Sequence, residues 1–177
     1  MTASMQHGWE TLRHGGLLLD ADRLRRIAEY VPVETPWFRE EELRRRASKL
    51  LADEEEAGDF VSFVLETLCG FPREGQAWLR GTQVPAEFGR RTVTGTTSKP
   101  RQIWRGPRGA ILPVFFDGEK RLGIGKGKRA VSDALQWLRA GTERLALLTN
   151  GRQWGLLFAG LDFDAWCESD LDLWFED

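Results

Sequence analysis

Cysteine and histidine are scarce in this sequence. Its 177 residues include two cysteines, Cys69 and Cys167, and two histidines, His7 and His14, without a CxxC pair. A structural zinc site needs four Cys or His ligands at characteristic spacings, so the pattern argues against one. We expect both cysteines to be core thiols and both histidines to lie on the surface.

Long apolar runs are absent as well. No stretch approaches the roughly 20 apolar residues that a membrane span requires. The first 16 residues lack a charged start followed by an apolar secretory block. We therefore expect a cytoplasmic protein with no membrane partner. The 41% of hydrophobic residues, with eight Trp and ten Phe, are enough for the core of one compact domain.

Charge is unevenly distributed along the chain, although the net charge is only −2. Residues 89–129 carry eleven basic side chains against two acidic ones, and residues 160–177 carry seven acidic side chains and no basic one. Clustered Lys and Arg bind polyanions by displacing the counterions condensed on phosphates, which predicts a polyanion-binding face. The alternative is that these charges lie on the solvated faces of ordinary strands and loops.

The N-terminal third has helical spacing. We expect helices at 20–30 and 35–51, the second with Thr35 as its cap and Pro36 at its first position, and a third from Asp59 to Gly70. Glu66 falls on a different side of the third helix from the apolar stripe. It is therefore a candidate for the rim of an active site or, alternatively, a solvated side chain.

From about residue 84 the pattern changes to short β-like runs. Strands are expected at 91–95, 101–104, 110–116, 121–125, 144–149 and 154–160, with one helix at 130–141. Hairpin turns are predicted at Asp117-Gly118 and, as type I′, at Asn150-Gly151. The order α-β-β-β-α-β predicts an α/β (α+β) fold with a mixed sheet flanked by helices. Residues 1–58 would form an N-terminal helical extension and residues 59–177 the α/β domain.

Two adjacent segments, "LPVFFDGEKRLGIGKGKRAVSDALQWLRA" and "RLALLTNGRQWGLLFAGLDFDAW", carry a family resemblance. Over roughly residues 59–168 the chain resembles the PD-(D/E)XK, or restriction-endonuclease-like, superfamily. The likeness is to the region ahead of the adenine methylase in single-chain restriction-modification and phage-defence proteins. There a hairpin with acidic and lysine motifs leads into a helix with a Gln, and the next strand ends in a TNG-x-W turn. The resemblance implies double-stranded DNA and a methyltransferase portion or subunit as partners.

The catalytic motif that this resemblance implies is incomplete. An active member holds Mg²⁺ between the Asp of a first motif and the Glu of a Glu-x-Lys motif. Here Ile124-Gly125-Lys126 stands at the Glu-x-Lys position, and the first motif falls near Leu112-Pro113. An Mg²⁺-dependent endonuclease would have to use Glu66, Asp117 as the metal ligand, Lys126 and Gln136, with Glu119 as a further carboxylate. The chain contains no methyltransferase motif.

The segment "GIGKGKR" suits a phosphate without any carboxylate. Three glycines and three bases precede a helix start, whose free N–H groups favour an anion, and the spacing is not that of a Walker A loop. We expect Lys126, Lys128 and Arg129, together with Arg101 and Arg105, to contact DNA. The alternative is a flexible connection between a strand and a helix.

Three functional hypotheses follow from the sequence. The first is a DNA-binding, nuclease-like accessory domain of a restriction-modification or phage-defence DNA methyltransferase system. The second is an active metal-dependent DNA endonuclease. The third is a protein-interaction module that docks on a methylase subunit through the acidic end and exposed Trp174 and Phe175. Because these large apolar residues lie near the last residue, we expect a fragment of a longer protein. The acidic end could also cover the basic face as a DNA mimic.

Overall fold

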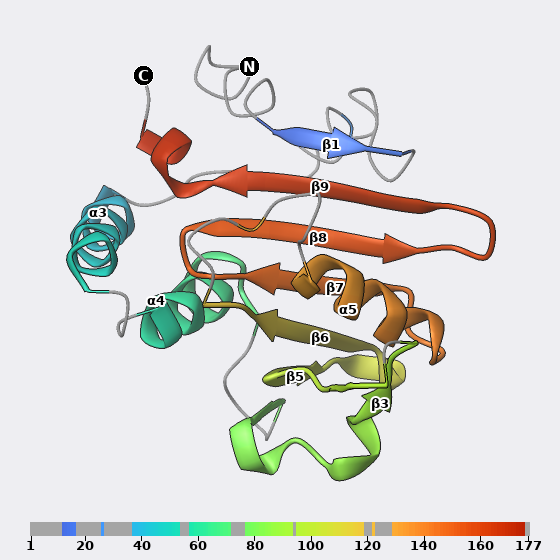
Figure 1. Cartoon of the computed structure of the whole chain (residues 1–177). Helices are drawn as coiled ribbons and strands as arrows, with labels where there is room; N and C mark the ends of the chain where they lie inside the picture. The colour runs from blue at the N-terminus through green and yellow to red at the C-terminus, as the bar shows by residue number, and fades with distance from the viewer. Residues whose placement is uncertain are drawn as a thin grey trace.

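A seven-stranded mixed sheet forms the centre of the protein (Figure 1). The computed structural model describes residues 12–16, 26, 37–53, 57–71, 77–93, 95–118, 122 and 129–175. The strand order is β1-β9-β8-β7-β6-β5-β2, and β3 and β4 form a separate two-stranded sheet. The strands are β1 (Arg13–Gly15), β2 (Trp78–Arg80), β3 (Arg90–Arg91), β4 (Thr97–Ser98), β5 (Gln102–Arg105), β6 (Ile111–Phe116), β7 (Leu145–Thr149), β8 (Gln153–Ala159) and β9 (Asp164–Asp170).

One pair in the large sheet, β6 with β7, is parallel, and the other neighbouring strands are antiparallel. Helix α5 (Arg129–Arg139) lies between β6 and β7 in the chain and makes the crossover that a parallel pair requires. Helices α3 (Trp37–Ala52) and α4 (Ala57–Phe63) precede the strands, and α4 continues as a π-helical turn, Val64–Leu68. The predicted mixed sheet with helices is therefore confirmed, although its edge strand β2 was not predicted.

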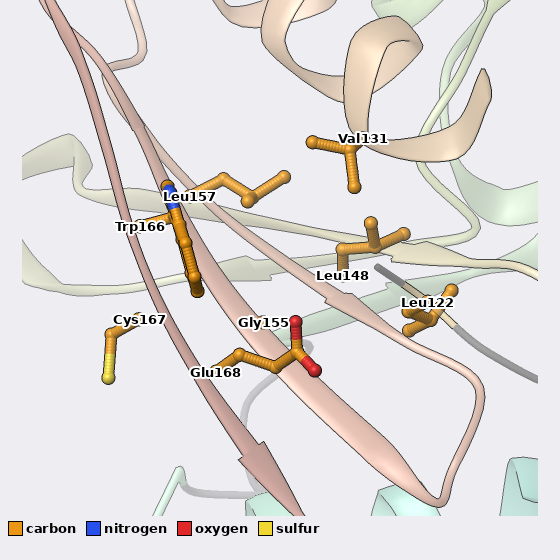
Figure 2. A pocket seen from close by; sticks show the side chains of 8 residues that line it. All are labelled: Leu122, Val131, Leu148, Gly155, Leu157, Trp166, Cys167 and Glu168. Carbon is orange, nitrogen blue, oxygen red and sulfur yellow. The ribbon is translucent and has the colours of Figure 1, made fainter. Parts of the chain in front are cut away.

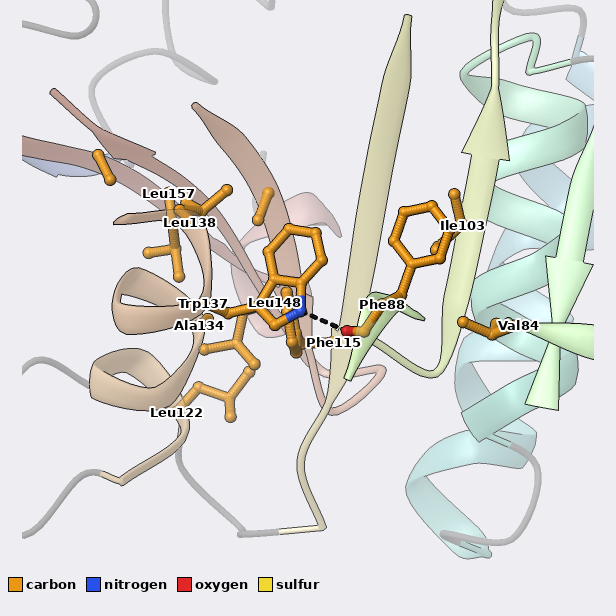
Figure 3. Packing of buried hydrophobic residues seen from close by; sticks show 12 residues of the cluster. Val84, Phe88, Ile103, Phe115, Leu122, Ala134, Trp137, Leu138, Leu148 and Leu157 are labelled. Carbon is orange, nitrogen blue, oxygen red and sulfur yellow. Dashed lines mark hydrogen bonds between the residues drawn. The ribbon is translucent and has the colours of Figure 1, made fainter. Parts of the chain in front are cut away.

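Alternation along the strands gives the sheet two apolar faces. Phe115 packs toward α5, whereas the preceding residue, Val114, packs toward α4. The α5 side centres on Trp137, which is fully buried. Its indole stacks on Phe88 at 6.5 Å between centroids and meets Phe115 edge-on at 5.6 Å. The indole Nε1 donates to the carbonyl oxygen of Phe88 at 2.7 Å (Figure 3).

The opposite face is covered by α3 and α4. Ala47 and Leu50 of α3 belong to the same buried cluster as Phe60 of α4 and Trp154 of β8. The spacing of Leu43, Ala47 and Leu50 places one stripe of α3 on this core, as expected of an amphipathic helix. The division of the chain at residue 58 stays a prediction. No helix among the described residues is long and apolar enough to cross a membrane.

Strands β7 and β8 form the hairpin predicted at Asn150-Gly151, but the predicted type I′ turn is wrong. Thr149 pairs with Trp154, so the central residues of the turn are Gly151 and Arg152. Only Gly151 has a positive φ, of 88°, and one such residue at the first central position is typical of type II′. The Asn150 side chain instead accepts hydrogen bonds from the backbone N–H groups of Arg152 (3.0 Å) and Gln153 (2.7 Å).

The acidic end of the chain is part of the sheet. Residues Asp164–Asp170 form β9 and residues Leu171–Phe175 a 3-10 helix, neither of which the sequence predicted. Trp174 lies 5.9 Å from the Trp154 ring and donates from Nε1 to the Ser169 hydroxyl at 2.6 Å. The Arg44 guanidinium lies 4.7 Å above the Phe175 ring. Both terminal aromatic residues therefore pack on their own chain, which corrects the expectation that they are exposed.

Other expectations have mixed outcomes. The strand predicted at 91–95 is reduced to Arg90–Arg91. The segments 121–125 and 20–30 lie outside the described residues except for Leu122 and Arg26. Cys167 is buried as expected. Cys69 follows the last residue of the π-helical turn and is exposed, so the prediction of a core thiol is wrong for Cys69. His14 is exposed as expected, and His7 lies outside the described residues.

Candidate nucleic-acid interface and nuclease-like site

Lys126 and Lys128 of the "GIGKGKR" segment lie outside the described residues, and so does Glu119. Arg129 is the first residue of α5. Asp117 directly follows β6 at the carboxyl end of the parallel pair, and its backbone N–H donates to the Thr149 carbonyl at 3.2 Å. Carboxyl ends of parallel strands at a crossover are frequent ligand sites, so Asp117 lies at an end of the sheet where ligands commonly bind.

The first-motif position near Leu112-Pro113 falls on β6, and the second strand of the expected hairpin, at 121–125, lies outside the described residues except for Leu122. Strand β5 is the antiparallel neighbour of β6 on the other side, where Gln102 pairs with Val114 and Trp104 pairs with Leu112. Strand β6 contains no Asp or Glu, whereas a nuclease metal site needs a carboxylate at the first-motif position. In the described part of the chain, no group of three or more His, Cys, Asp and Glu residues could hold a metal ion.

Glu66 lies in the π-helical turn and forms an ion pair with Arg80 at the end of β2. The Glu66 side chain is 13% exposed and that of Arg80 is 33% exposed. The Arg80 guanidinium lies 5.4 Å above the ring of Trp78, and Arg80 pairs across the strands with buried Gln102. Short π-helical insertions occur frequently at functional sites. Sequence reasoning missed Arg80, because a three-residue edge strand gives no periodic signal.

Buried polar atoms without a hydrogen-bond partner gather beside this ion pair. Trp78 and Arg80 of β2 face Trp104 and Gln102 of β5 in direct register. These four residues supply four of the six such atoms among the described residues: Trp78 Nε1, Arg80 Nε, Gln102 Oε1, Trp104 Nε1, Gln153 Oε1 and Asp164 Oδ1. Buried polar groups are normally paired, so a local concentration of exceptions points to a functional role or a missing partner.

A run of basic residues without acidic neighbours surrounds β5. Residues 88–116 contain six basic side chains and no Asp or Glu. We use the name basic segment for residues 90–108. Five of its basic residues are exposed and form no ion pair within the described part of the chain: Arg91, Lys99, Arg101, Arg105 and Arg108. These charges are free to attract a polyanion.

The sixth basic residue, Arg90, attaches β3 to α5. Its guanidinium lies 3.5 Å from the centre of the Trp137 ring, donates to the Trp137 carbonyl at 2.9 Å and pairs with Glu143 at 2.6 Å. Gln136 makes a second attachment, since its Oε1 accepts from the Val93 N–H at 2.9 Å and its Nε2 donates to the Ser132 hydroxyl at 2.9 Å. The Oε1 atom of Gln136 thus attaches α5 to the β3–β4 turn, and its Nε2 bonds to a hydroxyl one turn earlier in α5.

Acidic residues near the end of the chain are paired far from the basic segment. Glu168 pairs with Arg13, Asp164 with Arg139 and Asp172 with Arg152. Hydrogen bonding and the charge of Asp172 raise the pKa of Arg152. The placement argues against the hypothesis that the acidic end covers the basic face, because these carboxylates neutralise other arginines.

A small pocket lies between α5 and the sheet (Figure 2). Apolar side chains of α5 and strands β7 to β9 line it, with the carboxylate of Glu168 at one side. Its volume is about 10 Å³, which is the scale of a single water molecule. Glu168 is buried and accepts a hydrogen bond from Gln153 Nε2 at 3.4 Å. The pocket is therefore a packing feature beside a buried carboxylate and has no room for a substrate.

Comparison with known proteins identifies no relative: no family model matches the chain, and no curated protein and no solved structure matches it either. The function must therefore be argued from the geometry of β2, β5 and the basic segment.

Proposed function

We propose that the chain is a DNA-binding, nuclease-like accessory domain of a restriction-modification or phage-defence methyltransferase system. The mixed sheet, with a parallel β6–β7 pair connected through α5, supports this assignment, because the resemblance implies a mixed sheet flanked by helices. The lack of a carboxylate on β6, where the first motif falls near Leu112-Pro113, supports an accessory role in place of cleavage.

The observation that carries the proposal is the basic segment. Arg101 immediately precedes β5, and Arg105 is its last residue. Both are exposed and have no ion pair among the described residues. In contrast, Arg44, Arg45 and Arg46 of α3 are each paired with a glutamate three or four residues away. Unneutralised arginines bind backbone phosphates with release of counterions, which gives DNA affinity that falls steeply with salt.

A fluorescence anisotropy titration of a labelled DNA duplex at several salt concentrations tests the proposal. The Arg101→Ala/Arg105→Ala double variant is expected to weaken binding and to reduce the slope of log K against log salt by about 1.8, or about 0.9 for each lost phosphate contact. The matched control is Arg44→Ala/Arg45→Ala, which removes two arginines that are paired with Glu40 and Glu42 on α3. The control is expected to bind as the wild type does.

Absence of duplex binding by the wild type at low salt would contradict the proposal. A Lys126→Ala/Lys128→Ala/Arg129→Ala variant separately tests the "GIGKGKR" contact, and equal binding by it would remove that segment from the interface. Supercoiled plasmid incubated with Mg²⁺ or Mn²⁺ is expected to remain intact. Cutting that is lost in Asp117→Ala would replace the accessory role with endonuclease activity.

A further inference from the structure

Three basic residues, Arg80, Lys99 and Arg101, lie around the turn that follows β2. The Gly81 N–H donates to the Arg101 carbonyl at 2.9 Å, which brings the Arg101 backbone next to the end of β2, where Arg80 lies. Lys99 Nζ donates to the Val84 carbonyl at 2.7 Å at the other end of the same turn. Among the described residues, Arg80 of this group is paired with Glu66, and no ion pair is found for Lys99 or Arg101. Three positive charges with one paired negative charge leave an excess that favours an anion.

Hydrogen-bonding groups next to Arg80 also favour an anion. Three of the four unpartnered buried atoms on β2 and β5 are N–H donors, from Trp78, Arg80 and Trp104, and one is the carbonyl oxygen of Gln102. Donors without acceptors contribute a positive potential, which acts strongly where the local dielectric constant is low. Gln102 is only 6% exposed, so this potential is poorly screened by water.

We propose that Arg80 and Arg101 bind a backbone phosphate of DNA without a metal ion, with Arg80 supplying a fixed positive charge beside β5. This inference rests on the DNA binding proposed above. A guanidinium suits the role because its planar donors match phosphate oxygens and it keeps its charge at all relevant pH values. Glu66 and the Trp78 ring hold Arg80 in place, and the 33% exposure of its side chain leaves part of it accessible to DNA.

Substitutions at the two members of the ion pair are expected to act in opposite directions. Arg80→Gln removes the phosphate contact and is expected to weaken duplex binding about tenfold or more. Glu66→Gln removes the competing negative charge but keeps a side-chain oxygen that can accept a hydrogen bond from Arg80, and it is expected to tighten binding about two- to fivefold. A purely structural role for the pair would weaken binding in both variants, so the opposite signs are diagnostic.

The matched control is another Glu–Arg pair on the surface, Glu42 and Arg45 of α3, which lie 2.6 Å apart. Glu42→Gln and Arg45→Gln are expected to change the duplex affinity less than twofold. Circular dichroism establishes that each variant is folded. Binding is expected to be equal in EDTA and in Mg²⁺ at the same ionic strength, since no metal takes part.

Each result supports or overturns a distinct statement. If the wild type fails to bind DNA at low salt, the proposed function itself fails. If the wild type binds but folded Arg80→Gln binds equally well, or Glu66→Gln also weakens binding, only the Arg80 site fails. If Mg²⁺ raised the duplex affinity more than tenfold, the statement that the Arg80 site works without a metal ion would be overturned. Inorganic phosphate is expected to displace the duplex no better than chloride does at equal ionic strength. If phosphate displaced it specifically, and Arg80→Gln abolished this effect, the site would be assigned to free phosphate.

Discussion

Replacement of Trp137 by Phe tests the packing of α5 on the sheet. The indole Nε1 donates to the Phe88 carbonyl at 2.7 Å, and Phe cannot replace this hydrogen bond. A buried carbonyl left without a partner costs about 1–3 kcal/mol, and the smaller ring leaves a void that adds about 1 kcal/mol. We therefore expect Trp137→Phe to lower the free energy of unfolding by about 2–4 kcal/mol.

Urea unfolding followed by far-ultraviolet circular dichroism measures this loss without relying on the fluorescence of the other tryptophans. For a chain of this length, the same loss lowers Tm by about 4–16 °C. The matched control is Trp174→Phe, which also removes an indole hydrogen bond, here to the partly buried Ser169 hydroxyl. Because water can replace that contact, we expect a cost below about 1 kcal/mol. Equal costs in the two variants would refute the reasoning.

Two further predictions concern the turn of the β7–β8 hairpin and the surface of α3. Gly151 has a φ of 88°, and a Cβ there would come 3.2 Å from Leu50. Gly151→Ala is therefore expected to lower the free energy of unfolding in urea by about 1–2 kcal/mol. The control Gly58→Ala, where a Cβ would meet no atom within 4 Å, is expected to stabilise α4 by about 0.5 kcal/mol. An unchanged free energy of unfolding in Gly151→Ala would contradict the argument. Hydrogen bonds from Arg45 and Arg46 lower the pKa of Glu42 from 4.5 to about 2. Because its folded pKa is the lower one, its stabilisation is present above pH 4.5 and lost as the pH falls toward 2. Carboxyl NMR titration is expected to give the low value in wild type and a return toward 4.5 in Arg45→Gln/Arg46→Gln.

Much of the fold follows from local patterns. Helices α3 and α5 and strands β5 to β8 have the spacing that their burial requires, so the sequence predicts them within a few residues. Strand β9 was missed because Asp164, Glu168 and Asp170 make it look like a solvated tail. Its carboxylates are tolerated in the sheet because Arg139, Arg13 and Gln153 bind them, and such partners are visible only once the strands are paired.

The candidate site was predictable only in part. Glu66 was singled out because it lies off the apolar stripe of its helix, and it does reach a polar cluster. Its partner Arg80 depends on the pairing of β2 with β5 and on a π-helical turn, and neither has a sequence signature. The basic segment was visible as a charge pattern, but its lack of ion pairs emerged only when the acidic residues were located elsewhere.

Strand β1 joins the sheet through residues that are distant in the chain, since Arg13 and Glu168 are 155 positions apart. Such a pairing requires closure of a long loop, whose entropy is lost before any contact forms. We therefore expect β1 to dock last during refolding and its amide protons to exchange first in the native protein. A short edge strand that docks last can also be supplied by another copy of the chain. Rapid refolding at high protein concentration is accordingly expected to yield strand-exchanged dimers, which dilution before refolding would prevent.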